Sequence, residues 1–212
     1  MCVICCSPKG TPQPTIPTIR RMFARNPHGA GYMYARDGKV TIHKGFMNIE
    51  DLLRQLKVEH FTADDPVVYH FRISTQAGVT PTMTQPFPLT SSLDKCEKLD
   101  ILACGCGIAH NGIIRMTSDG DPQYSDTALF ITQYATRILH NVSDLKDPNI
   151  LDILSELTHS RLALLDRTGY IATVGNYITE CNGLMYSNTC YQPPVTPPHV
   201  KKTYCDYYPY RI

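Results

Sequence analysis

The sequence carries almost no excess of charge of either sign. Of its 212 residues, 20 are Lys or Arg and 19 are Asp or Glu, which leaves a formal net charge of +1. Proteins that bind nucleic-acid backbone or anionic membrane mainly through charge need a positive excess, so we expect neither partner. The chain also lacks a membrane-spanning run, because its longest apolar stretch, Ile101 to Ala109, is far shorter than the ~18 residues required.

Export signals, repeats and clear linkers are missing as well. No basic stretch followed by an apolar region opens the chain, so no signal peptide is visible. With 9 cysteines and no export signal, we expect reduced thiols and a cytoplasmic location. Without an internal repeat or a composition break, the chain is expected to form one domain over residues 1–192, followed by a Pro- and Tyr-rich tail over 193–212.

What is present has the composition and patterning of a globular α+β protein. Hydrophobic residues make up 42% of the chain, an ordinary fraction for a packed core. Apolar runs and turn signals predict strands at 1–6, 30–35, 39–44, 66–72, 99–110, 161–166, 170–174 and 184–187. Helical spacing and capping residues predict helices at 18–25, 49–58, 125–140 and 149–158. This order of elements fits one layered domain.

Cys2 carries the most unusual chemistry in the sequence. A small residue directly after Met1 permits removal of the methionine, which would leave a cysteine with a free α-amine. Such an amine has an ordinary pKa of ~7.7–8.0 and can take the thiol proton near neutral pH. On its own, however, Cys2 is better explained as a small residue with no function.

Three later segments carry groups that suit a small amino-acid substrate. Arg72 ends an apolar strand, and a guanidinium binds a carboxylate in bidentate geometry. Asn111 and Gly112 follow a predicted strand and offer two hydrogen-bond donors to one oxyanion. Asp126 begins a predicted helix and suits an ammonium group. The alternatives are a surface salt bridge for Arg72, an ordinary turn at Asn111 and Gly112, and a helix cap at Asp126.

Taken together and in this order, these segments resemble one family. The sequence is similar to the class II glutamine amidotransferase domain, an N-terminal-nucleophile hydrolase. Four segments carry the resemblance in addition to Cys2, and they are residues 27–32, 70–75 (His-Phe-Arg-Ile-Ser-Thr), 110–112 (His-Asn-Gly) and 125–127 (Ser-Asp-Thr). The resemblance covers residues 2 to about 130 and implies an α+β fold, the four-layer αββα sandwich of N-terminal-nucleophile hydrolases.

The resemblance also implies how the chemistry would run. Cys2 would attack the side-chain amide of glutamine with its own α-amine as base, and water would then release glutamate from the thioester. Asn111 and Gly112 would stabilise the oxyanion. The catalytic set is therefore these three residues, and the resemblance implies neither a cofactor nor a metal.

Substrate binding is implied at four further positions. Arg72 would hold the α-carboxylate of glutamine and Asp126 its α-ammonium, while Thr75 and Gln76 would line the same pocket. Gln76 is also a departure, since the family often has histidine there. Three more departures are Val3 after the cysteine in place of glycine, His28 in place of aspartate and Ala128 in place of glutamate. They leave open whether the substrate is glutamine or another γ-glutamyl compound.

Several hypotheses about the function stay open. The chain is too short to include a full ammonia-accepting synthetase domain, so released ammonia would pass to a separate synthetase subunit, or the protein is a free-standing amidohydrolase. A non-catalytic binding or inhibitory module on the same fold is the competing class. A zinc site using Cys2, Cys5 and residues 104–106 is a weaker alternative, because neighbouring side chains of a strand point to opposite faces and no histidine completes the spacing.

Overall fold

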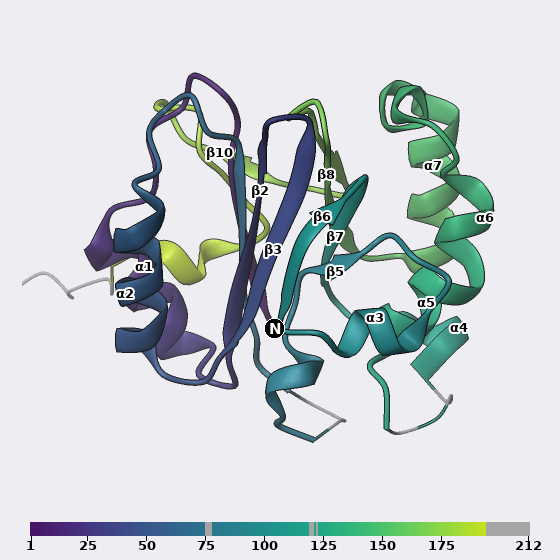
Figure 1. The fold of residues 1–212 in the computed structure, drawn as a ribbon, viewed down its shortest axis with the longest axis horizontal. Helices are drawn as coiled ribbons and strands as arrows, with labels where there is room; N and C mark the ends of the chain where they lie inside the picture. Colours follow the sequence, from purple (N-terminus) through teal and green to yellow (C-terminus); the bar gives the residue numbers. More distant parts are fainter. Residues whose placement is uncertain (75–77, 119–120, 122, 194–212) are drawn as a thin grey trace, which may run out of the picture.

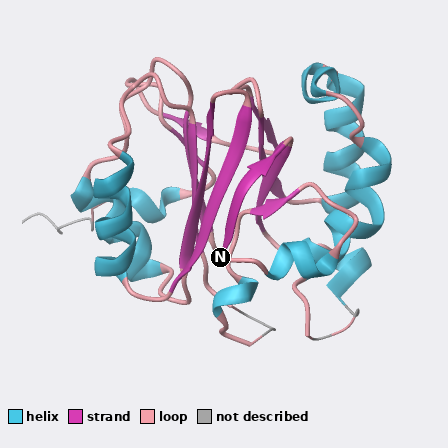
Figure 2. Cartoon of the chain, viewed as in Figure 1, coloured by secondary structure: helices cyan, strands magenta, loops and turns pink. Residues whose placement is uncertain are grey.

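Two antiparallel sheets form the centre of the protein, with helices at both sides (Figures 1 and 2). The computed structural model describes residues 1–74, 78–118, 121 and 123–193. Thr75, Gln76 and residues 194–212 of the tail lie outside the described residues. Within the described ranges, the larger sheet has seven strands in the order β10-β11-β1-β4-β2-β3-β6, and the smaller has four in the order β5-β7-β8-β9.

The strands have the following bounds. In the larger sheet they are β1 Val3–Ser7, β2 Ala30–Arg36, β3 Lys39–Phe46, β4 Val67–Phe71, β6 Asp100–Cys104, β10 Ile178–Thr179 and β11 Met185–Tyr186. In the smaller sheet they are β5 Phe87–Pro88, β7 Cys106–Asn111, β8 Arg161–Asp166 and β9 Ile171–Val174.

The helices divide into two groups. The α-helices are α1 Ile16–Arg25, α2 Ile49–Glu59, α3 Leu93–Glu97, α4 Arg115–Ser118, α5 Asp126–Phe130, α6 Thr136–Ile138 and α7 Pro148–Thr158. Figure 1 shows α1 and α2 at one side of the strands and α4 to α7 at the other. None of the helices in the described ranges has the length and apolar character that spanning a bilayer requires.

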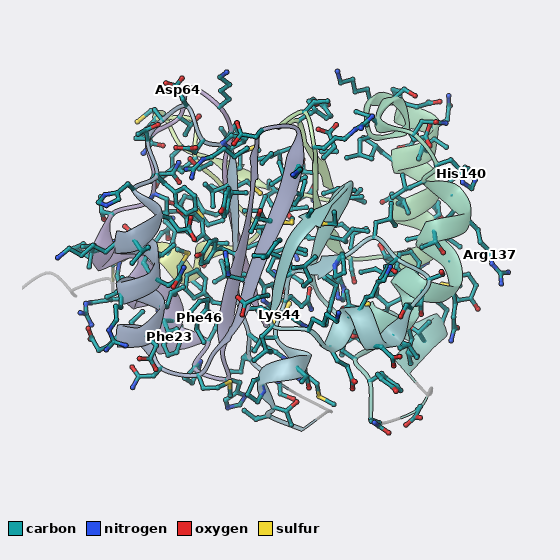
Figure 3. All side chains as sticks on the ribbon, in the orientation of Figure 1. Phe23, Lys44, Phe46, Asp64, Arg137 and His140 are labelled. Atoms are coloured by element: carbon teal, nitrogen blue, oxygen red, sulfur yellow. The ribbon has the colours of Figure 1, made fainter. Side chains whose placement is uncertain are left out.

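The hydrophobic core has three parts. One cluster joins α1 and α2 to the larger sheet through residues such as Phe23, which Figure 3 labels, and Leu52. A second cluster contains Ile4 of the larger sheet and Ala163 of the smaller, so it lies between the two sheets. A third joins the smaller sheet to the other helices through residues such as Phe130. Both faces of each sheet therefore contribute to the buried core.

The turn between β2 and β3 follows directly from its sequence. Asp37 has a φ of 52° and Gly38 a φ of 70°. Two successive positive φ angles match the right-handed twist of paired strands, and an Asp-Gly pair adopts them at low cost. The hairpin predicted at this position is confirmed, with Arg36 paired to Lys39.

The single strand predicted over residues 99–110 is wrong. The segment forms two strands, β6 and β7, that belong to different sheets and are separated by Gly105. Every residue of β7 is buried, whereas β6 is largely exposed and pairs with β3 at the edge of the larger sheet. A continuous apolar run gave no sign that the chain would change sheets here.

The long helix predicted over 125–140 is interrupted. It begins as expected, because the Ser125 side chain accepts a hydrogen bond from the Ala128 N–H at 3.1 Å. After α5, however, residues Ile131–Ala135 form a π-helical segment before α6. Helical spacing of apolar residues predicts that a helix exists but does not resolve a local change of hydrogen-bond pattern.

Lys44 on β3 is a buried cation that holds the following loops against the sheet (Figure 3). Its Nζ donates hydrogen bonds to the carbonyl oxygens of Thr82 at 2.6 Å, Thr84 at 3.1 Å and Cys96 at 2.6 Å. It also lies 4.0 Å from the centre of the Phe87 ring. An ammonium has three donors, and all three are used here.

Replacing this lysine should therefore destabilise the fold. In Lys44→Met, buried carbonyl oxygens lose their donor, and we expect the free energy of unfolding to fall by about 2–4 kcal/mol. Chemical denaturation measures the change. Lys39→Met, an exposed lysine on the same strand, is the matched control, and equal stability of the two variants would contradict this role for Lys44.

Candidate active site

Strand pairing brings Cys2 and Arg72 together. β1 and β4 are antiparallel, with Val3 opposite Phe71, so the residue before β1 lies beside the residue after β4. The Cys2 Sγ accepts a hydrogen bond from the Ile73 N–H at 3.4 Å. In Figure 1, the N-terminus lies near one end of the strands, between the two groups of helices.

The Cys2 thiol is partly buried and in its neutral form. Burial raises its pKa, while the Ile73 N–H and the charges of Arg72 and the chain's terminal amine oppose that shift. Because the thiolate is the nucleophilic form of cysteine, the thiol needs a nearby base to become reactive. With Met1 attached, the nitrogen of Cys2 is part of a peptide bond and cannot be that base.

Arg72 is buried and has a free binding position. Its side chain belongs to a residue only 6% exposed, and its Nη1 has no hydrogen-bond partner in the described part of the chain. Burial lowers the pKa of Arg72, while the negative forms of Cys2 and Asp126 raise it. A buried guanidinium nitrogen without a partner favours an anion, and a carboxylate suits its geometry. The surface salt bridge considered from the sequence does not fit this burial.

Asn111 is the last residue of β7 in the neighbouring sheet, and Gly112 follows it. Asn111 is fully buried, and its Nδ2 donates one hydrogen bond to the Ser187 Oγ at 2.8 Å. An amide nitrogen has a second N–H, which can serve an oxyanion. At Gly112, a Cβ would lie 2.8 Å from the Cβ of Ser160, so no other residue fits without a shift.

Asp126 is the first residue of α5 and is held by backbone donors. Its Oδ2 accepts a hydrogen bond from the Ile114 N–H at 2.7 Å, and its Oδ1 accepts one from the Thr127 N–H at 2.8 Å. These bonds fix the carboxylate, and each oxygen keeps further acceptor capacity for an ammonium. The Asp126 side chain is partly exposed.

The described members of the expected site therefore lie on converging elements. Cys2 and Asp126 each act electrostatically on Arg72, which places both near its guanidinium. Thr75 and Gln76 lie outside the described residues. Ser74, the residue before Thr75, is held by His28, whose Nδ1 accepts a hydrogen bond from the Ser74 N–H at 2.9 Å.

Two residues that the sequence did not single out contact the site. The Asn188 Nδ2 donates a hydrogen bond to the carbonyl oxygen of Cys2 at 2.6 Å. The Ser187 Oγ accepts hydrogen bonds from the Ile4 N–H at 2.8 Å and from Asn111. Both follow β11, more than 180 residues from Cys2 in the chain, and no local pattern pointed to them.

A buried network of histidines supports the end of β7. The His70 Nε2 donates a hydrogen bond to the His110 carbonyl oxygen at 3.0 Å, which links the two sheets. The His110 Nδ1 lies 2.8 Å from the Thr127 Oγ1, and its backbone N–H donates to the Gln85 Oε1 at 2.7 Å. Burial lowers the pKa of His110 to about 4 and that of His70 to about 3.

This burial makes the protein sensitive to acid. An unfolded histidine binds a proton near pH 6.5, whereas folded His110 does so only near pH 4. The unfolded state therefore binds more protons between these values, and His110 alone lowers the free energy of unfolding by about 3 kcal/mol as the pH drops from 6.5 to 4, to which buried His70 adds in the same direction. NMR titration of the His110 ring should show no protonation above pH 5. A midpoint near 6.5 would contradict the buried neutral ring.

A metal centre finds no support in the described residues. No group of three or more His, Cys, Asp or Glu side chains there is arranged to hold a metal ion. Cys5 belongs to the cluster beneath α1 and α2, whereas Cys6 belongs to the cluster between the sheets. The two side chains thus point to opposite faces, as strand geometry predicts, and every cysteine in the described ranges is a free thiol.

Sequence comparison identifies no relative. No protein-family profile matches the chain, and no curated protein matches it. The fold, in contrast, is similar to that of glutamine phosphoribosylpyrophosphate (PRPP) amidotransferase from B. subtilis complexed with ADP and GMP. The TM-score is 0.53 at 21% sequence identity, and the match covers 90% of this chain and 42% of that chain.

A second solved structure gives a weaker match. It is described as the allosteric regulatory enzyme of purine biosynthesis, with a TM-score of 0.48, 20% identity, and coverage of 90% of this chain and 42% of that chain. This chain thus spans less than half the length of either structure. The first match confirms, at the level of the fold, the resemblance to a glutamine amidotransferase domain that the sequence motifs indicate.

Proposed function

We propose that this protein hydrolyses the side-chain amide of glutamine or a related γ-glutamyl compound. The observation that carries the proposal is the pairing of β1 with β4, which places Cys2 beside Arg72. Asp126 acts electrostatically on Arg72, and Asn111 is joined to β1 through Ser187. These groups stand on a fold similar to that of a glutamine PRPP amidotransferase. A nucleophile, a cation with a nitrogen free to bind an anion, a fixed carboxylate and a pair of oxyanion donors are groups suited to amide hydrolysis of an amino acid. The finer fold assignment, a four-layer αββα sandwich, is part of this proposal.

The reaction would begin with a processed N-terminus. After Met1 is removed, the α-amine of Cys2 takes the thiol proton, and the thiolate attacks the amide carbon. The tetrahedral oxyanion is stabilised by the second N–H of Asn111 and the N–H of Gly112. The C–N bond breaks as the nitrogen is protonated, ammonia leaves, and a thioester remains. Water then adds to the thioester, which releases the carboxylate product and restores the thiol.

The substrate would be held by its two charged ends. Its α-carboxylate binds the free Nη1 of buried Arg72, and its α-ammonium binds Asp126, with Thr75 and Gln76 as the remaining pocket residues. In the low-dielectric surroundings of Arg72 such a contact is strong. The negative charge of the carboxylate would favour the charged form of Arg72, which burial disfavours.

The destination of the ammonia separates two forms of the proposal. Either a separate synthetase subunit accepts it, in a cytoplasm that keeps the thiols reduced, or the protein acts alone as a hydrolase. Co-purification with an ATP-using partner that accelerates glutamine turnover favours transfer. Robust turnover by the isolated protein, unaffected by other proteins, favours hydrolysis.

Removal of the thiol tests the assignment of the nucleophile. Purified protein whose intact mass shows loss of Met1 should release ammonia from glutamine, and Cys2→Ala should reduce this rate to background because no thioester can form. Cys104→Ala, a partly buried cysteine on β6, should retain wild-type activity. Unchanged ammonia release by Cys2→Ala, or full retention of Met1 in active protein, would contradict the mechanism.

Replacement of the guanidinium tests the carboxylate site. Arg72→Lys keeps a positive charge but loses bidentate geometry, so we expect KM for glutamine to rise about 10- to 100-fold, with a smaller change in kcat. Steady-state kinetics with glutamine and with 4-aminobutanamide, an amide without an α-carboxylate, measure the effect. The two proteins should process the second substrate alike. An equal defect on both substrates would show that Arg72 does not bind the carboxylate.

A further inference from the structure

We infer that Ser187 is a positioning residue of the site, which orients the Asn111 amide toward the oxyanion. This inference rests on the proposed function and adds to it a residue outside the nucleophile, the oxyanion donors and the substrate anchors. Ser187 follows β11 and is 2% exposed. Its hydroxyl is thus shielded from solvent, and its hydrogen bonds are made with the protein.

The Ser187 hydroxyl accepts two hydrogen bonds from two different sheets. One comes from the backbone N–H of Ile4 on β1, and the other from the Nδ2 of Asn111 on β7, each at 2.8 Å. A hydroxyl has two acceptor lone pairs, and both are occupied. Backbone pairing locks Ser187 itself, because its N–H donates to the Ile4 carbonyl oxygen at 3.0 Å.

These bonds determine how Asn111 presents its donors. The Nδ2 group is planar and has two N–H bonds in fixed directions, so directing one to Ser187 fixes the direction of the other. The Asn111 Oδ1 has no hydrogen-bond partner in the described part of the chain, so no hydrogen bond at that oxygen holds the amide plane. The bond to Ser187 is therefore the contact that sets the orientation.

The adjacent residue connects the same segment to the nucleophile. The Asn188 Nδ2 donates to the carbonyl oxygen of Cys2 at 2.6 Å, and its Oδ1 accepts a hydrogen bond from the Cys190 N–H at 3.0 Å. Residues 187 and 188 thus contact both Asn111 and Cys2. This short segment directly after β11 therefore fixes the position of Cys2, the proposed nucleophile, relative to Asn111, the proposed oxyanion donor.

Loss of the Ser187 hydroxyl should weaken the transition state more than substrate binding. In Ser187→Ala the Asn111 amide loses its fixed direction, and we expect kcat for ammonia release to fall about 10- to 100-fold with KM changed less than about twofold. Ser187→Thr keeps the hydroxyl and should recover most of kcat. Alkylation of Cys2 by iodoacetamide forms no oxyanion, so its rate should stay at the wild-type value.

Ser7→Ala is the matched control for general destabilisation. Ser7 is also fully buried, lies at the opposite end of β1, and donates to the carbonyl oxygens of Thr11 and Pro12. It should retain wild-type kcat. A wild-type kcat in Ser187→Ala, or an equal loss of kcat in Ser7→Ala, would overturn the inference.

A spectroscopic measurement separates failure of this inference from failure of the proposed function. If the processed wild-type protein releases no ammonia, the proposed function fails, and the side-chain NH₂ signals of Asn111 in ¹⁵N-asparagine-labelled protein then decide on Ser187. We expect both signals to shift and to exchange faster with solvent in Ser187→Ala than in wild type or Ser7→Ala. Unchanged signals would refute the positioning role, whatever the activity.

Discussion

The antiparallel pairing of β1 with β4 is the constraint on which the site depends. Its register places Val3 opposite Phe71, and Cys2 and Arg72 then emerge side by side at the end of the sheet. A shift by one residue would turn each side chain of β1 to the opposite face. Cys6 would then leave the core between the sheets, and Cys5 would leave the core beneath the helices. Packing on both faces therefore protects the position of the proposed nucleophile.

The second sheet positions Asn111, and polar contacts that cross the apolar core connect it to the first sheet. His70 donates to the backbone of His110, and Ser187 joins β1 to Asn111. Buried polar groups are costly unless they are paired, so such bonds fix the relative position of the sheets more specifically than apolar packing alone. Asn111, the proposed oxyanion donor, thereby keeps a defined position relative to β1 and the proposed nucleophile Cys2, although the two lie on different sheets.

Much of this arrangement could be predicted from local sequence, and the remainder depends on distant contacts. Asp37-Gly38 predicts its hairpin and Ser125 its helix cap, because both signals act within a few residues. The change of sheet at Gly105 and the role of Ser187 were missed. Each depends on which strands lie beside the segment in the fold, and an isolated Gly or Ser carries no sign of that.

Catalysis by a processed Cys2 requires a covalent acyl intermediate between its sulfur and the substrate. Acid quenching during glutamine turnover, followed by mass spectrometry of the N-terminal peptide, tests it most directly. We expect a peptide that lacks Met1 and carries a glutamyl group on Cys2, removable by hydroxylamine. Glutamine turnover by protein whose N-terminal peptide retains Met1 would contradict this mechanism. So would the absence of a glutamyl group on Cys2 at every quench time.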